Sequence, residues 1–262
     1  MITIEIRDKE NHLLYVQSDN KEVTLGGYRG LYQEGDRIKI LSDQNNIYLK
    51  LLLDQSLNEN IVYLKGYEYT FNIPFKDERK PYGDNAFTGE RHWGYASIIN
   101  GDELNNYMKL SENSYDTNCN DKLYPHASTN VKTVNPQFFP RNAIDGVFET
   151  CNHGSWPHSS WGINQQSDAW LKIDFGRKVH MKQMCFYLRA DFPHDNYWIS
   201  GELELSNGES IELTFYKSGK SQSIDVDLKS IEWIKLKKLI MSDEPSSFPA
   251  LSQIVIYGYN EL

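Results

Sequence analysis

Two stretches of the sequence concentrate the aromatic, basic and amide side chains that can hold a polar ligand. Residues 153–164 read His-Gly-Ser-Trp-Pro-His-Ser-Ser-Trp-Gly-Ile-Asn, and residues 189–198 read Arg-Ala-Asp-Phe-Pro-His-Asp-Asn-Tyr-Trp. A sugar ring needs a flat aromatic face for its C–H surface and fork-like donors and acceptors for its vicinal hydroxyls. We therefore predict a carbohydrate site built from Trp156, His158, Trp161, Arg189, Asp191, His194, Asn196 and Trp198.

Each of these side chains also has a purely structural interpretation. Arg189 and Asp191 have the charges for a salt bridge, His194 is suited to capping a turn, and Trp161 or Trp198 is large enough to fill the end of a β-barrel. A zinc site is the third alternative, built from histidines in polar loops. The spacing of His126, His153, His158 and His194 matches no compact zinc motif, so the sequence favours the first two interpretations.

Catalysis requires a nucleophile beside a base, or a pair of acids, in a defined context. Ser159 and Ser160 beside His158 do not form a nucleophile elbow. Asp191 and Asp195 are the residues that could act as a pair of carboxylates. In the first half, Glu90-Arg-His-Trp93 lies near Arg79 and Tyr82 in the sequence. This segment is a second candidate site, at a cleft between domains, or else ordinary strand and loop packing.

Composition and charge restrict the class of protein. The 262 residues are 24% charged and 39% hydrophobic, which is typical of a folded chain. The net charge of −9 repels nucleic acid and anionic lipid, so we expect neither as a partner. No run approaches the roughly 18 apolar residues of a membrane span.

The start of the chain and its cysteines bear on location. Residues 1–8 alternate apolar and polar types and lack the apolar stretch of a signal peptide. Cys119, Cys151 and Cys185 form an odd, sparse set without metal-type spacing. We expect a cytoplasmic protein, although a secreted chain from which a leader had been trimmed would look the same.

The first hundred residues predict a small β-sandwich. Apolar residues alternate or cluster in short runs separated by Gly, Asn and Asp turns, at residues 2–6, 14–16, 37–41, 47–53, 61–64 and 69–73. A two-turn helix is predicted at 102–110, followed by a polar linker at 111–122. The predicted division is thus a first domain at 1–100, a helix and linker at 101–123, and a second domain at 124–262.

The second half also predicts strands and no long helix. The runs are 169–175, 183–188, 201–205, 210–216, 223–227, 233–236 and 254–257, and Asn207-Gly208 is a hairpin signal between two of them. The expected fold class is all-β, with two β-sandwich domains.

Four motifs in this half, in order, carry a resemblance to a known family. They are Ala143-Ile-Asp-Gly146 with Thr150, Trp170-Leu-Lys-Ile-Asp-Phe-Gly176, Leu205-Ser-Asn-Gly208 and Ala250-Leu-Ser-Gln-Ile-Val-Ile-Tyr-Gly258. Residues 124–258 thereby resemble the discoidin family, also called the coagulation factor 5/8 C-type or galactose-binding-like domain, which includes bacterial carbohydrate-binding modules.

The resemblance implies a jelly-roll sandwich that binds carbohydrate without catalysis, through loops at one end. Arg189 matches the position of a family arginine that follows a strand and contributes to the ligand site. Two alternatives remain open: an enzyme acting on polysaccharides or glycosides at the domain interface, and a protein–protein adaptor.

The resemblance also implies a structural calcium ion. The family holds it with an Asp carboxylate, a Thr hydroxyl, backbone carbonyls and an acidic residue near the last strand. Asp145 and Thr150 match the first two positions, but Gln253 stands in place of the acid. Because Ca²⁺ prefers anionic oxygens, this replacement predicts weaker binding. Asp145 then has the alternative role of capping its own loop.

Overall fold

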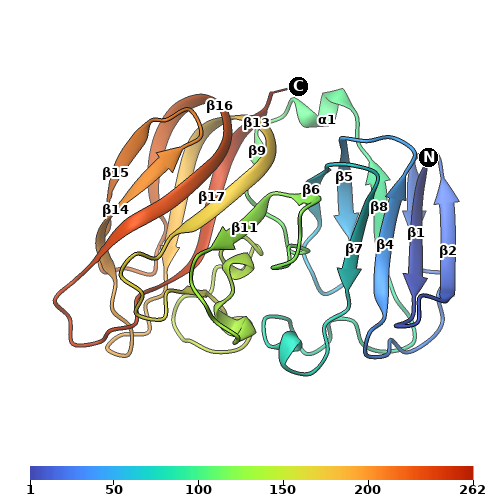
Figure 1. Cartoon of the computed structure of the whole chain (residues 1–262), viewed down its shortest axis with the longest axis horizontal. Coiled ribbons are helices and arrows are strands. Elements are labelled where there is room, and N and C mark those ends of the chain that lie inside the picture. Colours follow the sequence, from blue (N-terminus) through green and yellow to red (C-terminus); the bar gives the residue numbers. More distant parts are fainter. Residues whose placement is uncertain (262) are drawn as a thin grey trace.

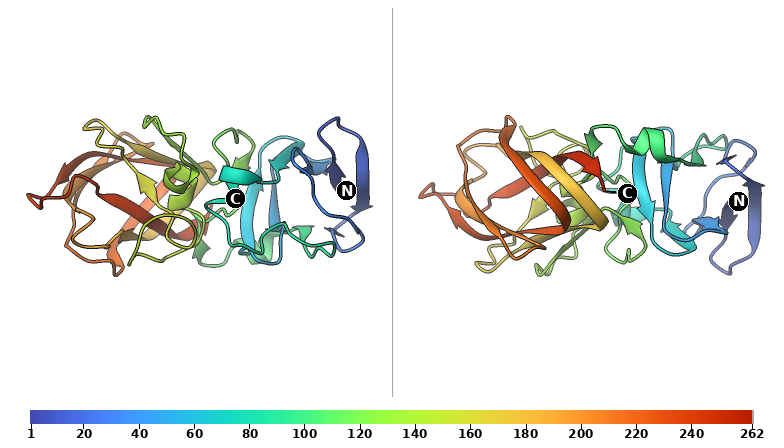
Figure 2. Two further views of the ribbon diagram at one scale, coloured as in Figure 1. Left: turned by 90° about the horizontal axis from the view of Figure 1, so that it is seen from below. Right: turned by 90° about the horizontal axis from the view of Figure 1, so that it is seen from above.

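A computed structural model describes residues 1–261, which form two β-sandwiches side by side (Figure 1). Two further views show the sandwiches at opposite ends of the long axis, with the C-terminus between them (Figure 2). The all-β, two-sandwich architecture predicted from the sequence is confirmed. Within residues 1–261 the helices span at most four residues, and none is long and apolar enough to cross a membrane.

The N-terminal sandwich consists of two antiparallel sheets. One has the strand order β2-β1-β4-β7, with bounds Leu13–Asp19, Ile2–Arg7, Arg37–Ser42 and Glu68–Asn72. The other has the order β10-β6-β5-β8-β3, with bounds Leu123–Tyr124, Asn60–Leu64, Ile47–Leu52, Tyr95–Ile98 and Glu22–Thr24. The six predicted strands are present, and the structure adds β3, β8 and the late strand β10.

The C-terminal sandwich is one continuous folded sheet. Its main order is β12-β17-β13-β16-β14-β15, with bounds Trp161–Gly162, Ala250–Asn260, Leu171–Leu188, Gln222–Met241, Trp198–Leu205 and Ser210–Thr214. Two more strands join at its edges: β9 (Met108–Lys109) pairs with β17, and β11 (His126–Thr129) pairs with β13. Short 3₁₀ turns occupy Lys76–Arg79, Pro136–Phe138 and Pro140–Ala143.

Bulges in the two longest strands let a single sheet form both layers. The pairing of β13 with β16 shifts register between Asp174 and Val179 and again near Met181. Up to Asp174 β13 pairs with β11, and from Val179 onward it pairs with β17. A bulge bends its strand and increases the local twist, so each long strand can pass from one layer to the other. The sequence predicted the halves of β13, and those of β16, as separate strands.

Each sandwich has its own hydrophobic core. In β1 the alternation of Ile2, Ile4 and Ile6 with polar residues buries one face completely. The second core is built around β13, β16 and β17, where residues such as Phe186 and Ile254 are buried. Two-residue periodicity thus explains the placement of most strands.

The segment between the predicted domains differs from the sequence prediction. The helix α1 covers only Gly101–Leu104, and Met108 and Lys109 form a strand with β17 instead of continuing that helix. Residues 110–116 are buried rather than forming an exposed polar linker. Leu110 belongs to the C-terminal core, and Tyr115 and Leu123 belong to the N-terminal core.

The polar side chains of this segment are satisfied inside the protein. Ser111 Oγ donates to the carbonyl of Ile254 at 3.0 Å and accepts from the amide of Ile256 at 2.9 Å. The amide of Ser114 donates to Asn60 Oδ1 at 2.6 Å. Tyr115 Oη donates to the carbonyl of Asn58 at 2.6 Å. A Ser- and Asn-rich composition therefore marks a buried hydrogen-bonded junction here, because each polar group has a partner on one of the two domains.

We predict that Asn60→Ala destabilises the whole chain. Asn60 is buried, and its amide group bonds both Ser114 and, at 3.1 Å, Glu112 Oε1. Leaving these groups unpaired costs about 1–3 kcal/mol, which urea unfolding measures as a lower midpoint. The exposed Asn45→Ala is the matched control. Limited proteolysis should cut residues 111–122 faster in Asn60→Ala alone; rapid cutting of the wild type there would contradict the buried junction.

Candidate ligand-binding site

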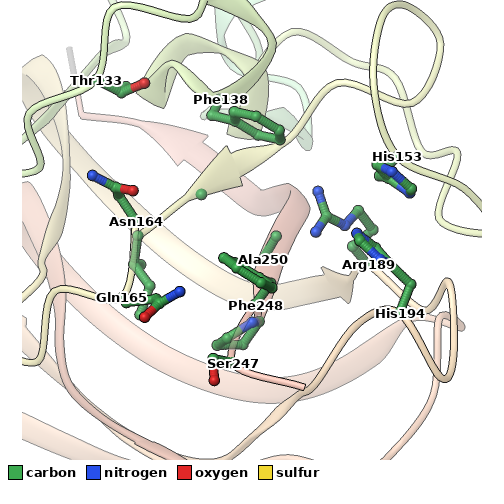
Figure 3. Close-up of a pocket in the computed structure, with 13 residues that line it drawn as sticks. Thr133, Phe138, His153, Asn164, Gln165, Arg189, His194, Ser247, Phe248 and Ala250 are labelled. Atoms are coloured by element: carbon green, nitrogen blue, oxygen red, sulfur yellow. The ribbon is translucent and has the colours of Figure 1, made fainter.

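A cavity of about 250 Å³ lies at one end of the C-terminal sandwich (Figure 3). Five segments form it: the loop and 3₁₀ turn at 133–138, His153, residues 162–165 at the end of β12, the region of Arg189 and His194 after β13, and residues 247–250 leading into β17. We call it the terminal cavity. It combines residues from both predicted loops with others that the sequence analysis did not single out.

Phenylalanine rings supply the apolar surface of the terminal cavity. Phe248 is 47% exposed, and Phe138 lines the opposite part of the rim in the close-up (Figure 3). The ring of His194 is parallel to that of Phe248, with centroids 6.3 Å apart, and His153 stacks on His194 at 3.9 Å. The three rings form one row along the edge of the cavity.

Arg189 is the main hydrogen-bond donor that points into this space (Figure 3). It is buried, and Asp195 holds it through Nε at 2.9 Å and Nη2 at 2.5 Å, while Nη1 donates to Ser160 Oγ at 3.2 Å. These bonds leave one N–H on each terminal nitrogen without a partner within residues 1–261. Because Asp195 fixes the guanidinium plane, the free donors keep a defined direction.

Asp191 and Asn196 position other residues and do not line the cavity. Asp191 Oδ2 lies 2.6 Å from His153 Nδ1 and so orients the first ring of the row. Asn196 is fully buried; its Nδ2 donates to the carbonyls of Ser242, Glu244 and Ser246. Those bonds hold the loop that carries Phe248. The prediction that Asn196 contacts ligand is therefore corrected: its side chain is hydrogen-bonded to the backbone of that loop.

The predicted tryptophans also lie away from the terminal cavity. Trp161 and Trp198 are buried in the core with ring centroids 6.0 Å apart, so neither can stack on a ligand. Trp156 is partly exposed, but its loop packs on the N-terminal domain, where its amide donates to the carbonyl of Lys80 at 2.7 Å. His158 Nδ1 is buried without a hydrogen-bond partner in the described part of the chain. Of the predicted ligand residues, Arg189 and His194 line the cavity.

Sequence reasoning missed Phe138, Asn164, Gln165 and Phe248 as lining residues, although Asn164 ended the first predicted stretch. Asn164 and Gln165 both have positive φ, at 47° and 58°, which is uncommon for residues other than glycine. No sequence signal marked that conformation. For Phe248 there was one: a lone aromatic residue in the polar, turn-rich run Ser246-Ser-Phe-Pro249.

The second candidate region, Glu90–Trp93, is packing within the N-terminal sandwich. His92 is buried, its Nε2 lies 2.7 Å from the carbonyl of Gly30, and its ring packs on Tyr28 and Tyr32. Arg91 forms an isolated backbone bridge with Arg29. Through these contacts the segment packs within the N-terminal domain and not at a cleft between the domains.

The predicted calcium ligands do not fit a tight calcium site. Asp145 Oδ1 accepts from the amide of Val147 at 3.0 Å, which is the loop-capping role, and Oδ2 lies 3.9 Å from the Arg141 guanidinium. Burial raises the pKa of Asp145 to about 7, so its carboxyl is a poor ligand near neutral pH. Thr150 Oγ1 donates to the carbonyl of Gly219. A cation beside a single carboxylate opposes Ca²⁺ binding.

Gln253 and the four histidines of the zinc alternative are the remaining candidate metal ligands. The Gln253 amide is buried with no partner within residues 1–261, and it contributes no charge to an ion. His126 Nδ1 lies 2.8 Å from Asp116 Oδ1, whereas His153 stacks on His194. Among the described residues, the group with metal-type geometry is Asp8, Glu10 and His12, at the surface of the N-terminal domain. None of the four histidines of the zinc alternative belongs to it.

No protein-family model and no curated protein matches this chain in sequence. Similar solved structures include a fucose-binding module of Streptococcus pneumoniae, with 18% identity over 52% of this chain and 95% of that chain and a TM-score of 0.39. The lectin domain of lectinolysin in complex with Lewis B antigen has 17% identity, 53% and 94% coverage and a TM-score of 0.40.

A third similar structure is the family 32 carbohydrate-binding module of C. perfringens NanJ in complex with galactose. It has 17% identity over 50% of this chain and 91% of that chain, with a TM-score of 0.39. All three are less than 25% identical to this chain, so the likeness concerns the fold.

We predict that Arg189→Ala mainly destabilises the protein. It leaves Asp195 as an unpaired buried carboxylate, a change that typically costs about 3–5 kcal/mol. Urea unfolding would show this loss, whereas the exposed Arg29→Ala should stay within about 0.5 kcal/mol of wild type. An unchanged unfolding midpoint for Arg189→Ala would show that Asp195 does not depend on this arginine.

Calcium should have no effect on stability. An ion that binds the native state raises the melting temperature by mass action, so thermal melts with calcium and with a chelator should coincide. The Asp145→Asn variant should likewise give the same melt under both conditions. A higher melting temperature with calcium that is lost in Asp145→Asn would contradict our interpretation of this loop.

Proposed function

We propose that this protein binds carbohydrate, with one sugar unit held in the terminal cavity. The observation that carries the proposal is the joint orientation of Phe248 and Arg189 toward one space. Phe248 offers an exposed ring, and Arg189 offers free N–H donors whose direction Asp195 fixes. This pairing of a ring face with directed donors matches the two surfaces of a sugar ring.

The other lining residues support a neutral, hydroxyl-rich ligand. Asn164 and Gln165 bring amide groups to one side of the cavity, and His153 and His194 bring ring nitrogens to the other (Figure 3). Amides and imidazoles both donate and accept hydrogen bonds, as hydroxyl groups do. The cavity volume of about 250 Å³ lies just below the roughly 300 Å³ at which pockets for larger ligands begin. It therefore suits a single ring.

Binding without catalysis is the form of the proposal that the chemistry favours. Glycoside hydrolysis uses two carboxyl groups that flank the bond to be broken. Neither Asp nor Glu lines the terminal cavity in the described part of the chain, and the nearby acids Asp191 and Asp195 are engaged with His153 and Arg189. The carboxylates thus act as positioning residues for the groups that face the ligand.

Calorimetry with galactose, fucose and N-acetylglucosamine tests this function. We expect at least one of these sugars to bind, and Phe248→Ala to weaken it about ten-fold, which corresponds to about 1.4 kcal/mol. Phe148→Ala is the matched control, because Phe148 is 39% exposed but lies outside the cavity, against Tyr187.

Arg189→Lys tests the directed donors without removing the charge. A lysine keeps a cation near Asp195 but loses the planar fork, so affinity should fall while the fold persists. Product analysis after incubation with any bound oligosaccharide separates binding from turnover. If Phe248→Ala and Arg189→Lys both bind as wild type does, the terminal cavity is not the site; if products form, the protein is an enzyme.

A further inference from the structure

A second cavity, of about 70 Å³, lies where the two sandwiches meet. Its walls come from residues 56–58 and 81–82 of the N-terminal domain, from Ser114, and from Arg141, Asp145, Val147 and Trp156. We call it the junction cavity. No residue lines both this cavity and the terminal cavity, so the two are separate spaces.

Three polar side chains at the junction cavity are more than nine-tenths buried. Tyr82 is 8% exposed, and Arg141 and Asp145 are each 4% exposed. Within residues 1–261 neither Tyr82 Oη nor Asp145 Oδ2 forms a hydrogen bond, and Arg141 Nη1, at 3.9 Å from Asp145 Oδ2, is too far away to donate to it. Neither atom is one of the fully enclosed side-chain atoms without a partner, so both can be reached from the cavity. A polar group that enters the cavity can therefore hydrogen-bond to both side chains in place of water.

The guanidinium of Arg141 also keeps unused donors. Its Nε donates to the carbonyl of Asp116 at 2.9 Å, its Nη2 to the carbonyl of Ser114 at 2.8 Å, and its Nη1 to Asn142 Oδ1 at 3.2 Å. These three bonds leave one N–H on each terminal nitrogen. Donors on Arg141 therefore stand beside an acceptor on Asp145 and a hydroxyl on Tyr82.

The charges at this site favour a neutral ligand. Arg141 lies over the ring of Tyr82, 4.7 Å from its centroid, and so occupies the place that a ligand cation would take. Asp145 in turn disfavours an anion whenever its carboxyl is ionised. A hydroxyl group both donates and accepts, which is what a site with Arg, Asp and Tyr side chains requires.

Trp156 adds an aromatic surface at the edge of the cavity. It is 43% exposed, and its ring packs on Gly83, where an added Cβ would lie 3.5 Å from Cζ3. Leu57 and Val147 are further apolar residues in the wall. The cavity thus presents apolar surface to C–H groups and polar atoms to hydroxyls.

We propose that the junction cavity is a second binding site, for the hydroxyl-bearing end of a neutral polyol such as the hydroxymethyl group of a sugar. A volume of about 70 Å³ accepts several water-sized groups, each of which needs about 10–15 Å³, but not a whole ring. The rest of the ligand lies outside, next to Trp156. This site does not depend on ligand binding in the terminal cavity.

The test follows the indole N–H signal of Trp156 by NMR on the ¹⁵N-labelled full chain, assigned with Trp156→Phe. Glycerol, galactose and N-acetylglucosamine are the probes. We expect this signal to shift along a saturable curve with at least one probe, while that of Trp93, which is 48% exposed on the N-terminal domain, stays fixed. Tyr82→Phe removes only the hydroxyl and should weaken binding about ten-fold, as should Asp145→Asn.

Phe248→Ala distinguishes the two cavities. The Trp156 curve should be unchanged in this variant, even if every sugar fails to bind the terminal cavity. The proposal is overturned if the Trp156 signal does not saturate with any probe, which would leave only water in the cavity. It is also overturned if Tyr82→Phe binds as wild type does, or if Phe248→Ala abolishes the Trp156 response.

Discussion

The arrangement of the two domains depends on the buried carboxylate of Asp116. This side chain accepts hydrogen bonds from the amide of Ala127 and from Asn120 Nδ2, both at 2.8 Å, and pairs with His126 Nδ1 at 2.8 Å. That pairing raises the pKa of His126 despite its burial. A buried charge is tolerated only when it is paired and hydrogen-bonded, so these contacts form together or not at all. They fix the chain as it passes from the strand of one sandwich, β10, to a strand of the other, β11.

Arg141 continues this junction toward the candidate sites. Its bonds to the carbonyls of Ser114 and Asp116 tie the 3₁₀ turn Pro140–Ala143 to the joining segment. The cost of burying a guanidinium is met by these neutral acceptors and by the face of Tyr82 from the N-terminal domain. The two sandwiches are therefore joined through polar groups that neither domain could bury alone. This makes the first domain a structural partner of the second, not a tethered neighbour.

The sequence predicted the strands better than the places where they bend or join. Alternating residues such as Ile2, Ile4 and Ile6 decide which face of a strand is buried, and that information is local. The strand predicted at 169–175 does not end there: β13 continues through Gly176 in a positive-φ conformation, close against the ring of Tyr124. That close approach is a tertiary contact between residues far apart in sequence. The joining segment was misjudged for the same reason, because its Ser and Asn residues are satisfied by distant partners.

The candidate site also separates what local sequence shows from what only tertiary contacts decide. The sequence located the loops and Arg189, because unusual residue types in turn-rich segments are visible locally. It could not tell which rings face outward: Trp161 and Trp198 fill the core of the sandwich, and the loop of Phe248 is held by Asn196. A fully buried indole stabilises the sandwich through its large apolar area. A ring that stacks on a ligand must instead stay exposed, and another residue must support its backbone.

The loop between Val147 and Ser160 connects these observations, because it supplies His153 to the terminal cavity and Trp156 to the junction cavity. Each end of this stretch is held independently. His153 is bonded to Asp191 of its own sandwich, and Trp156 is bonded to Lys80 of the other. A shift of the loop toward either anchor would lengthen the bond at the other, so its position is set jointly by both domains. The loop thus contributes a ring to each of the two cavities. A loop that reaches both must be longer than a turn that only joins two strands.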